Sequence, residues 1–266
     1  MFKLTVFLCV TLAAGPALAS ATPWQPVAPG VRARLISSDE VRDGKAMAGL
    51  ELDMQAGTRT YWRIPGETGI PTEFDFSGSS GVEEPSVLWP YPETDVTGGM
   101  RDYVYRGSVV VPVRFAVAGE TATVDAAVTL GICSDVCVPA RVSFNLPIPL
   151  AKRDAAQALR LDQAVAQTPI AWDQPGEPVG TITVTGDGLS IGGLDPRIDP
   201  ASLIADLGDP AILFGAPQKS RDGKALEMKL LGGTSSRGLE GRTVQLTFMT
   251  PMGAYAVSRP LPAPVS

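Results

Sequence analysis

The segment 122–146, ATVDAAVTLGICSDVCVPARVSFNL, alternates apolar and polar residues on both sides of a short turn. Its apolar residues are even-numbered over 124–132 before the turn and again over 138–146 after it. Because successive residues of a strand point to opposite faces, this period of two predicts a β-hairpin with one face in the core. The odd-numbered Cys133 and Cys137 then lie on the outward face, one on each side of the turn.

Residues 1–19 have the three parts of a secretory signal peptide. Lys3 supplies the positive charge, residues 4–14 form an apolar run, and residues 17–19 (Ala-Leu-Ala) form a cleavage site. The apolar run is well short of the roughly 20 residues that span a bilayer. We therefore expect cleavage after residue 19 and export of a chain that does not span the membrane.

Removal of the signal peptide, which contains Cys9, leaves Cys133 and Cys137 as the cysteines of the exported chain. An even number of cysteines in an oxidising compartment predicts a disulfide. Directly opposed strand residues have Cβ atoms roughly 4.5–5.5 Å apart, close to disulfide range. A ring of five residues stabilises a fold by about 2 kcal/mol, against about 4.7 kcal/mol for a hundred-residue loop. So short a ring favours a redox pair, with Cys133 and Cys137 as catalytic residues, over a structural staple.

The hairpin belongs to a chain that is β-rich on both sides of one helical segment. Residues 20–149 show short alternating strands separated by Gly and Pro, which is typical of a β-sandwich. Residues 150–169 predict a connecting helix, because the stretch 150–167 contains no Gly or Pro. Residues 170–266 return to the β pattern and end in a Pro-rich tail that we expect to fray. The sequence thus predicts an all-β protein with two β domains, of which the second is smaller.

The composition excludes several classes of function. The chain has 266 residues, no histidine, and 22 Lys and Arg against 28 Asp and Glu, for a net charge of −6. Without histidine, Ser-His-Asp and Cys-His catalytic sites and His-ligated metal sites cannot form. The acidic balance argues against a nucleic-acid partner. We expect neither a cofactor nor a metal ion.

Five aromatic residues before the hairpin have two interpretations. As a groove they would contact a protein partner, since aromatic residues are enriched at interfaces, whereas as core they would fill the sandwich. The core interpretation is the commoner one for such residues. They are Tyr61, Trp62, Trp89, Tyr103 and Tyr105.

A series of motifs runs through the first domain in a fixed order. They are YWRIPGETGIP at 61–71, Trp89-Pro90, Tyr105, Val111-Pro112-Val113 and GICSDVCVP at 131–139. Over about residues 30–149 this series resembles the periplasmic N-terminal domain of the thiol:disulfide interchange protein DsbD, in the variant found in the copper-sensitivity suppressor ScsB. The resemblance implies an immunoglobulin-like sandwich.

The resemblance also implies a function in periplasmic electron transfer. Cys133 and Cys137 match the redox cysteines of the family, which take electrons from a membrane transporter and reduce periplasmic partners. Thioredoxin-like proteins are the implied partners, and cytochrome c biogenesis or copper tolerance are the implied processes. A cap loop covers the cysteines in the family, and here residues 93–103 match it, with Val96, Met100 and Tyr103 as contacts.

The sequence differs from the family in two respects. The spacing between its cysteines is shorter than in the best-known members. It also carries neither the transmembrane domain nor the C-terminal thioredoxin domain of the full-length protein, so two alternatives stay open: the same electron chain as in the family, or a separate membrane partner.

Three functions compete at this point. The first is a periplasmic thiol–disulfide exchange protein of the protein-disulfide reductase type. The second is a non-catalytic adaptor or chaperone-like binding module with a structural disulfide. The third is a copper protein, because soft sulfur ligands select Cu(I), although no methionine lies near the cysteines in sequence.

The charges near the cysteines in sequence predict thiols of ordinary acidity. Asp135 lies between them and Arg141 lies on the same predicted face. An adjacent carboxylate disfavours a thiolate, so we expect at least one thiol to titrate no lower than about 8.5.

Overall fold

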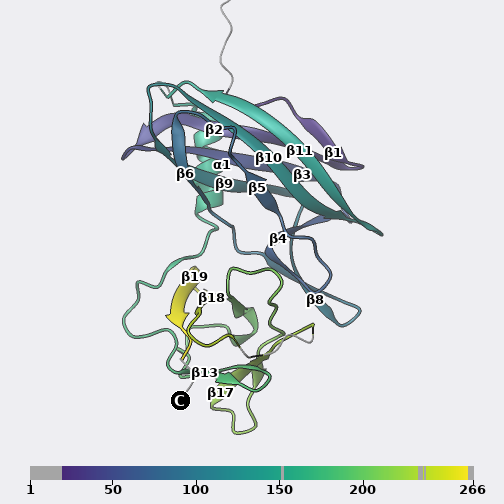
Figure 1. Ribbon diagram of the computed structural model, residues 1–266, viewed down its shortest axis with the longest axis vertical. Coiled ribbons are helices and arrows are strands. Elements are labelled where there is room, and N and C mark those ends of the chain that lie inside the picture. The colour runs from purple at the N-terminus through teal and green to yellow at the C-terminus, as the bar shows by residue number, and fades with distance from the viewer. Residues whose placement is uncertain (1–19, 151–152, 233–235, 237, 263–266) are drawn as a thin grey trace, which may run out of the picture.

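The computed structural model describes residues 20–150, 153–232, 236 and 238–262, which form two β units (Figure 1). The predicted signal peptide, with Cys9, lies outside the described residues. Within the described part of the chain, no helix has the length and apolar character needed to cross a bilayer.

The first unit is a sandwich of two antiparallel sheets, as the sequence predicted. The first sheet has the order β1-β2-β3-β9-β6. Its strands are β1 (Gln25–Ala28), β2 (Val31–Arg42), β3 (Lys45–Met54), β9 (Ser108–Val117) and β6 (Val82–Val87). The second sheet has the order β11-β10-β4-β8-β7, with β5 paired to β10. Its strands are β11 (Cys137–Ile148), β10 (Ala122–Cys133), β4 (Arg59–Gly66), β8 (Met100–Arg106), β7 (Glu93–Thr97) and β5 (Glu73–Asp75).

The core between these sheets comes from the alternation of apolar residues along each strand. In β10 and β11 the even-numbered side chains are buried over 122–132 and 140–148, while most odd-numbered ones are more exposed. They pack with buried residues of the facing sheet such as Leu50 and Val111. The expected all-β, immunoglobulin-like sandwich is therefore confirmed.

The hairpin of β10 and β11 keeps one register from Ala122↔Ile148 to Cys133↔Cys137. No bulge interrupts it, so the two cysteines lie directly opposite each other, as their parity predicted. Val138 was expected in the core and is instead 43% exposed, although its partner Ile132 on β10 is buried, because it lies near the tip of β11, the edge strand of the sheet.

Helix α1 (Ala155–Val165) follows the sandwich within the segment predicted to be helical. It begins at Asp154, whose carboxylate accepts hydrogen bonds from the first-turn N–H groups. Its buried face packs on β2, β3 and β9 of the sandwich. Gly49 makes the close approach feasible, since a Cβ there would lie 2.7 Å from a methyl group of Leu161.

The second unit contains two small sheets, with the orders β12-β19-β18-β15 and β13-β14-β17-β16. The first consists of β12 (Ile170–Ala171), β19 (Gly253–Pro260), β18 (Thr243–Thr250) and β15 (Ile204–Asp206). The second consists of β13 (Ile182–Thr185), β14 (Gly188–Gly192), β17 (Ala225–Lys229) and β16 (Gln218–Lys219), and a short 3-10 helix spans Pro200–Ser202. Strand β19 includes the first residues of the predicted tail, and Leu261 after it is buried.

The two units meet at the end of the sandwich where β4 and β8 extend toward the second unit (Figure 1). Ile204 of β15 is part of the core cluster of the sandwich. The Tyr91 hydroxyl donates to the Ser202 carbonyl at 2.5 Å. Arg63 of β4 donates to Asp206 at 2.8 Å and to Gln245 at 2.9 Å. The second unit thus contacts the sandwich at β4, the strand that contains both Tyr61 and Arg63.

Candidate functional site

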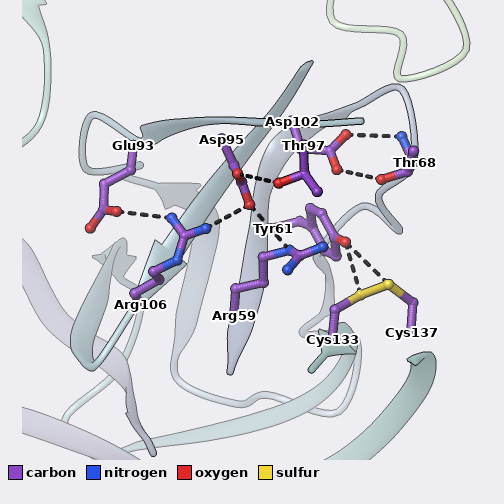
Figure 2. A network of polar contacts seen from close by, with 10 residues as sticks. All are labelled: Arg59, Tyr61, Thr68, Glu93, Asp95, Thr97, Asp102, Arg106, Cys133 and Cys137. Carbon is purple, nitrogen blue, oxygen red and sulfur yellow. Dashed lines mark hydrogen bonds and ion pairs between the residues drawn. A yellow bond between two sulfur atoms is a disulfide. The ribbon is translucent and has the colours of Figure 1, made fainter. Parts of the chain in front are cut away.

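The predicted disulfide is present at the tip of the β10–β11 hairpin (Figure 2). Cys133 is the last residue of β10, and Cys137 is the first residue of β11. Their Cα atoms are 4.0 Å apart, and the three turn residues between them are exposed.

The two sulfur-bearing residues differ in exposure, which the sequence analysis did not anticipate. Cys137 is exposed, whereas Cys133 is fully buried although it lies on the outward face of the sheet. The segment from Tyr61 to Ile70 covers that face. A Cβ at Gly131 would lie 2.7 Å from the Ile70 Cβ and 3.0 Å from the Tyr61 ring. Glycine at 131 therefore allows the covering segment to approach the backbone beside Cys133.

Tyr61 is the residue that contacts both sulfurs. Its hydroxyl lies 2.8 Å from the Cys133 Sγ and 3.4 Å from the Cys137 Sγ (Figure 2). The ring is fully buried in a small cluster with Val104 and Cys133. The Thr72 hydroxyl donates to the Tyr61 carbonyl at 2.8 Å and holds the strand in place. A phenol fixed in this way can donate a hydrogen bond to whichever sulfur becomes negative.

A group of charged residues lies on the same face of the sheet, across β4, β8 and β7 (Figure 2). Arg59 pairs with Cys133 in the sheet register and lies 3.6 Å from the Asp95 carboxylate. Arg106 contacts the same carboxylate at 2.6 Å and Glu93 at 3.0 Å.

Arg59 is a residue that the sequence analysis missed. The sequence alone indicates only Arg141 as a nearby cation, because it does not show that β4 pairs with β10. A signal existed nonetheless, since Arg59 and Tyr61 are two residues apart and share a face of β4.

The other aromatic candidates fill the sandwich, in agreement with the core interpretation. Trp62, Tyr103 and Tyr105 are buried, and the ring centroids of Trp62 and Tyr103 are 6.0 Å apart in an edge-on arrangement. Trp89 is partly buried against this core. Burial raises the pKa of Tyr103 and of Tyr105, so both phenols stay neutral.

Residues 93–103, which were expected to form a cap loop, lie in the hairpin of β7 and β8. Val96 and Met100 are 60% and 47% exposed near its tip, while Tyr103 points into the core. Strand β8 pairs with β4 at Tyr61↔Val104, which places this hairpin beside the tyrosine that contacts the sulfurs. The action of Val96 and Met100 as a cap stays a prediction.

Within the described part of the chain, no group of three or more Cys, Asp or Glu residues is arranged to hold a metal ion.

Comparisons with known proteins agree with this fold. Residues 32–149 match the family model described as the N-terminal domain of the thiol:disulfide interchange protein DsbD. The crystal structure of the N-terminal periplasmic domain of ScsB from Proteus mirabilis has a similar fold, with a TM-score of 0.68 and 21% sequence identity. That similarity covers 92% of this chain and 100% of the other, and so includes both β units. A search of curated proteins found no match. Residues 32–149, with the Cys133–Cys137 disulfide at their hairpin tip, thus form a domain similar to the N-terminal domain of DsbD.

Proposed function

We propose that the chain is a periplasmic thiol–disulfide interchange protein that carries electron pairs between other thiol proteins. Its Cys133–Cys137 disulfide accepts two electrons from a membrane-bound or thioredoxin-like dithiol and then passes them to a disulfide of a periplasmic protein. The similarity to a periplasmic domain of ScsB supports the location. One observation carries the proposal: the disulfide joins the exposed Cys137 to the buried Cys133, whose sulfur lies 2.8 Å from the Tyr61 hydroxyl.

The exposure of the two cysteines sets the direction of attack. The thiolate of the donor reaches Cys137, which is exposed, and cannot reach Cys133, which is fully buried. Attack forms a mixed disulfide at the Cys137 sulfur and breaks the Sγ–Sγ bond. The bonding electron pair moves to the Cys133 sulfur, which leaves as a thiolate.

The donor's second thiolate then completes the reduction. It attacks the donor sulfur of the mixed disulfide, so the donor departs as a disulfide and Cys137 is released as a thiolate that takes a proton from solvent. In the reverse sense, the Cys137 thiolate attacks the disulfide of a substrate, and Cys133 resolves the mixed disulfide. The Tyr61 hydroxyl, 2.8 Å from the Cys133 sulfur, donates a hydrogen bond to the leaving thiolate.

The reduction potential separates this function from that of a structural disulfide. Structural disulfides of secreted proteins have potentials below about −300 mV. Equilibration of the full chain with dithiothreitol or glutathione should give a value well above that limit. A potential below it, together with failure to exchange with a thioredoxin-like dithiol, would contradict the proposal.

Trapping of the mixed disulfide tests the assignment of the two sulfurs. In the Cys133→Ala variant the Cys137 thiolate should attack the disulfide of an added, oxidised thioredoxin-like protein and accumulate as a mixed disulfide, while the second partner sulfur leaves as a thiolate. The matched Cys137→Ala variant should accumulate none, because its remaining thiol is buried. Equal trapping by both variants would contradict the assignment.

A further inference from the structure

Arg59 is placed beside the buried sulfur by the pairing of two strands. Cys133 of β10 and Arg59 of β4 are direct partners in the sheet. Side chains of directly opposed residues project to the same face, with Cβ atoms about 4.5–5.5 Å apart. Tyr61, two residues further along β4, lies on that face and contacts both sulfurs. The Arg59 guanidinium therefore belongs to the surroundings of Cys133 (Figure 2).

Arg59 also has an unused hydrogen-bond donor in this place. Its Nε is buried and, among the described residues, has no hydrogen-bond partner. The Asp95 oxygen that faces it is 3.6 Å away and already accepts a hydrogen bond from Arg106 at 2.6 Å. The other Asp95 oxygen accepts one from the Thr97 hydroxyl at 2.9 Å. A buried donor is rarely left unpaired, so this one needs an explanation.

The opening of the disulfide creates a charge that needs such a donor. When the Sγ–Sγ bond breaks, the electron pair stays on Cys133, whose residue is 0% exposed. A buried anion is unfavourable unless cations and hydrogen bonds compensate for lost water. Tyr61 supplies one hydrogen bond, while the sulfur of a thiolate accepts more than one.

We infer that Arg59 stabilises the Cys133 thiolate, with its Nε as the donor that pairs with the sulfur once the disulfide opens. This inference rests on the proposed function, because it concerns the reduced state of the same pair. Arg59 then exchanges a long ion pair with Asp95 for a short one with sulfur. Arg106 remains to neutralise Asp95.

The other charged groups around the site are less suited to this role. Arg106 lies one strand farther from the sulfur and contacts both Glu93 and Asp95. Arg141 pairs with Thr129, four positions along the hairpin from the cysteines, or about 13 Å at 3.3 Å per residue. Two carboxylates also lie nearby: Asp135 is exposed in the turn, and Asp102 accepts hydrogen bonds from Thr68.

The test compares Arg59→Gln with Arg106→Gln, which removes a cation from the same Asp95 on the neighbouring strand. The ionisation of Cys133 is followed by thiolate ultraviolet absorbance in the full chain carrying Cys137→Ala. Arg59→Gln should shift the titration midpoint upward by about one pH unit, a tenfold loss in the ionisation constant. Arg59→Lys should recover much of the loss, and Arg106→Gln should shift the midpoint by much less than Arg59→Gln, because it leaves the guanidinium beside the sulfur in place.

The reduction potential supplies a second readout in the chain with both cysteines. At a pH above the wild-type midpoint, Arg59→Gln should move the equilibrium with glutathione toward the disulfide by up to about tenfold, or about 30 mV. The equilibrium shifts toward the disulfide because Arg59→Gln destabilises the reduced form, which contains the thiolate, and leaves the oxidised form unchanged.

The outcomes separate this inference from the proposed function. If the wild type exchanges with a dithiol while Arg59→Gln and Arg106→Gln titrate alike, the inference is wrong and the function stands. If the wild type does not exchange, the proposed function fails, whatever Arg59 does to the ionisation of Cys133. A shift that is much larger for Arg59→Gln than for Arg106→Gln and is recovered in Arg59→Lys supports the inference even if Arg59→Gln is less stable.

Discussion

Cys133 and Cys137 are four residues apart in the chain, yet their surroundings differ at the level of single side chains. Cys137 is open to a partner, while Cys133 lies beneath Tyr61 and opposite Arg59. In thiol–disulfide exchange the leaving sulfur departs faster when its thiolate is more stable. The buried side of the site therefore governs how readily the exposed sulfur is attacked.

Tyr61→Phe removes the hydroxyl near the sulfurs and keeps the ring. Hydrogen bonds to charged groups contribute about 1.5–3 kcal/mol, so reduction of the disulfide by dithiothreitol should slow by about tenfold or more. The control is Tyr105→Phe, whose lost hydroxyl donates to the Pro90 carbonyl away from the sulfurs. Stopped-flow measurement of reduction would give equal rates for the two variants if the Tyr61 hydroxyl had no part in the chemistry.

The disulfide itself should contribute little to stability. Its ring of five residues limits the entropic gain to about 2 kcal/mol, so oxidised and reduced wild type should differ by no more than that in unfolding free energy. Urea unfolding of both forms, extrapolated linearly to water, measures the difference. A reduced protein that is unfolded at ambient temperature would instead identify the disulfide as a structural staple.

At the scale of elements, the site is built where a hairpin meets a segment that crosses its outer face. Strands β10 and β11 set the cysteines opposite each other, and β4 with the segment up to Ile70 buries one of them. The pairing of β4 with β8 shifts register between Tyr61 and Gly66, so the ladder is interrupted at this point.

Gly131→Ala tests how tightly the covering segment is packed. The added methyl would lie 2.7 Å from the Ile70 Cβ, next to the backbone, so the segment must move. Overpacking of this kind costs about 1–3 kcal/mol, and the displaced segment should leave Cys133 more accessible to iodoacetamide in the reduced protein. Gly186→Ala, at a position with no atom within 4 Å, is the control and should change stability by less than about 0.5 kcal/mol. Unchanged alkylation of Cys133 would show that the segment is not what protects it.

At the scale of the whole molecule, the second unit is attached to the redox strand rather than to a remote surface. Arg63, which binds Asp206 and Gln245, is two residues from Tyr61 along β4. Ile204 adds an apolar contact with the core of the sandwich. We therefore expect a substitution at this junction to alter the position of β4 and to lower the stability of the fold.

Arg63→Met should be strongly destabilising. Its partner Asp206 is only 2% exposed in its side chain, and removal of one partner from a buried pair leaves an uncompensated charge, at a cost of about 3 kcal/mol. Lys229→Met breaks an exposed pair with Asp187 and should cost less than about 1 kcal/mol. Similar urea unfolding curves for the two variants would show that the junction contributes no more than a surface ion pair.

Asp206 should also give the stability a dependence on pH. Burial raises the pKa of its carboxyl above 3.8, and Arg63 opposes that shift in part. The folded state then holds the Asp206 proton more tightly than the unfolded state, so the unfolding free energy falls as the pH rises from about 4 through the raised pKa.

Asp206→Asn removes this contribution while it keeps an acceptor for Arg63. The unfolding free energy of the variant minus that of the wild type should therefore increase from about pH 4 to about pH 7, because only the wild type loses stability from this carboxyl as the pH rises. A constant difference between the two proteins across this range would show that Asp206 has the same pKa in both states.

The cysteine hairpin could be predicted from the sequence because its information is local. The period of two over 122–146 sets which side chains enter the core, and a turn of three residues leaves Cys133 and Cys137 opposite each other. The same alternation predicted the sandwich, and the absence of Gly and Pro predicted the helix. The burial of Trp62, Tyr103 and Tyr105 also followed from their apolar bulk.

The chemical surroundings of the disulfide arose only from the tertiary structure. Tyr61 and Cys133 are 72 residues apart, and Arg63 and Asp206 are 143 apart. Their contacts depend on which strands become neighbours, and the alternation within a strand does not specify its neighbours. A residue on the outward face of a sheet is exposed only if no other segment of the chain covers that face. Cys133 is buried and opposite a cation because β4 lies beside β10.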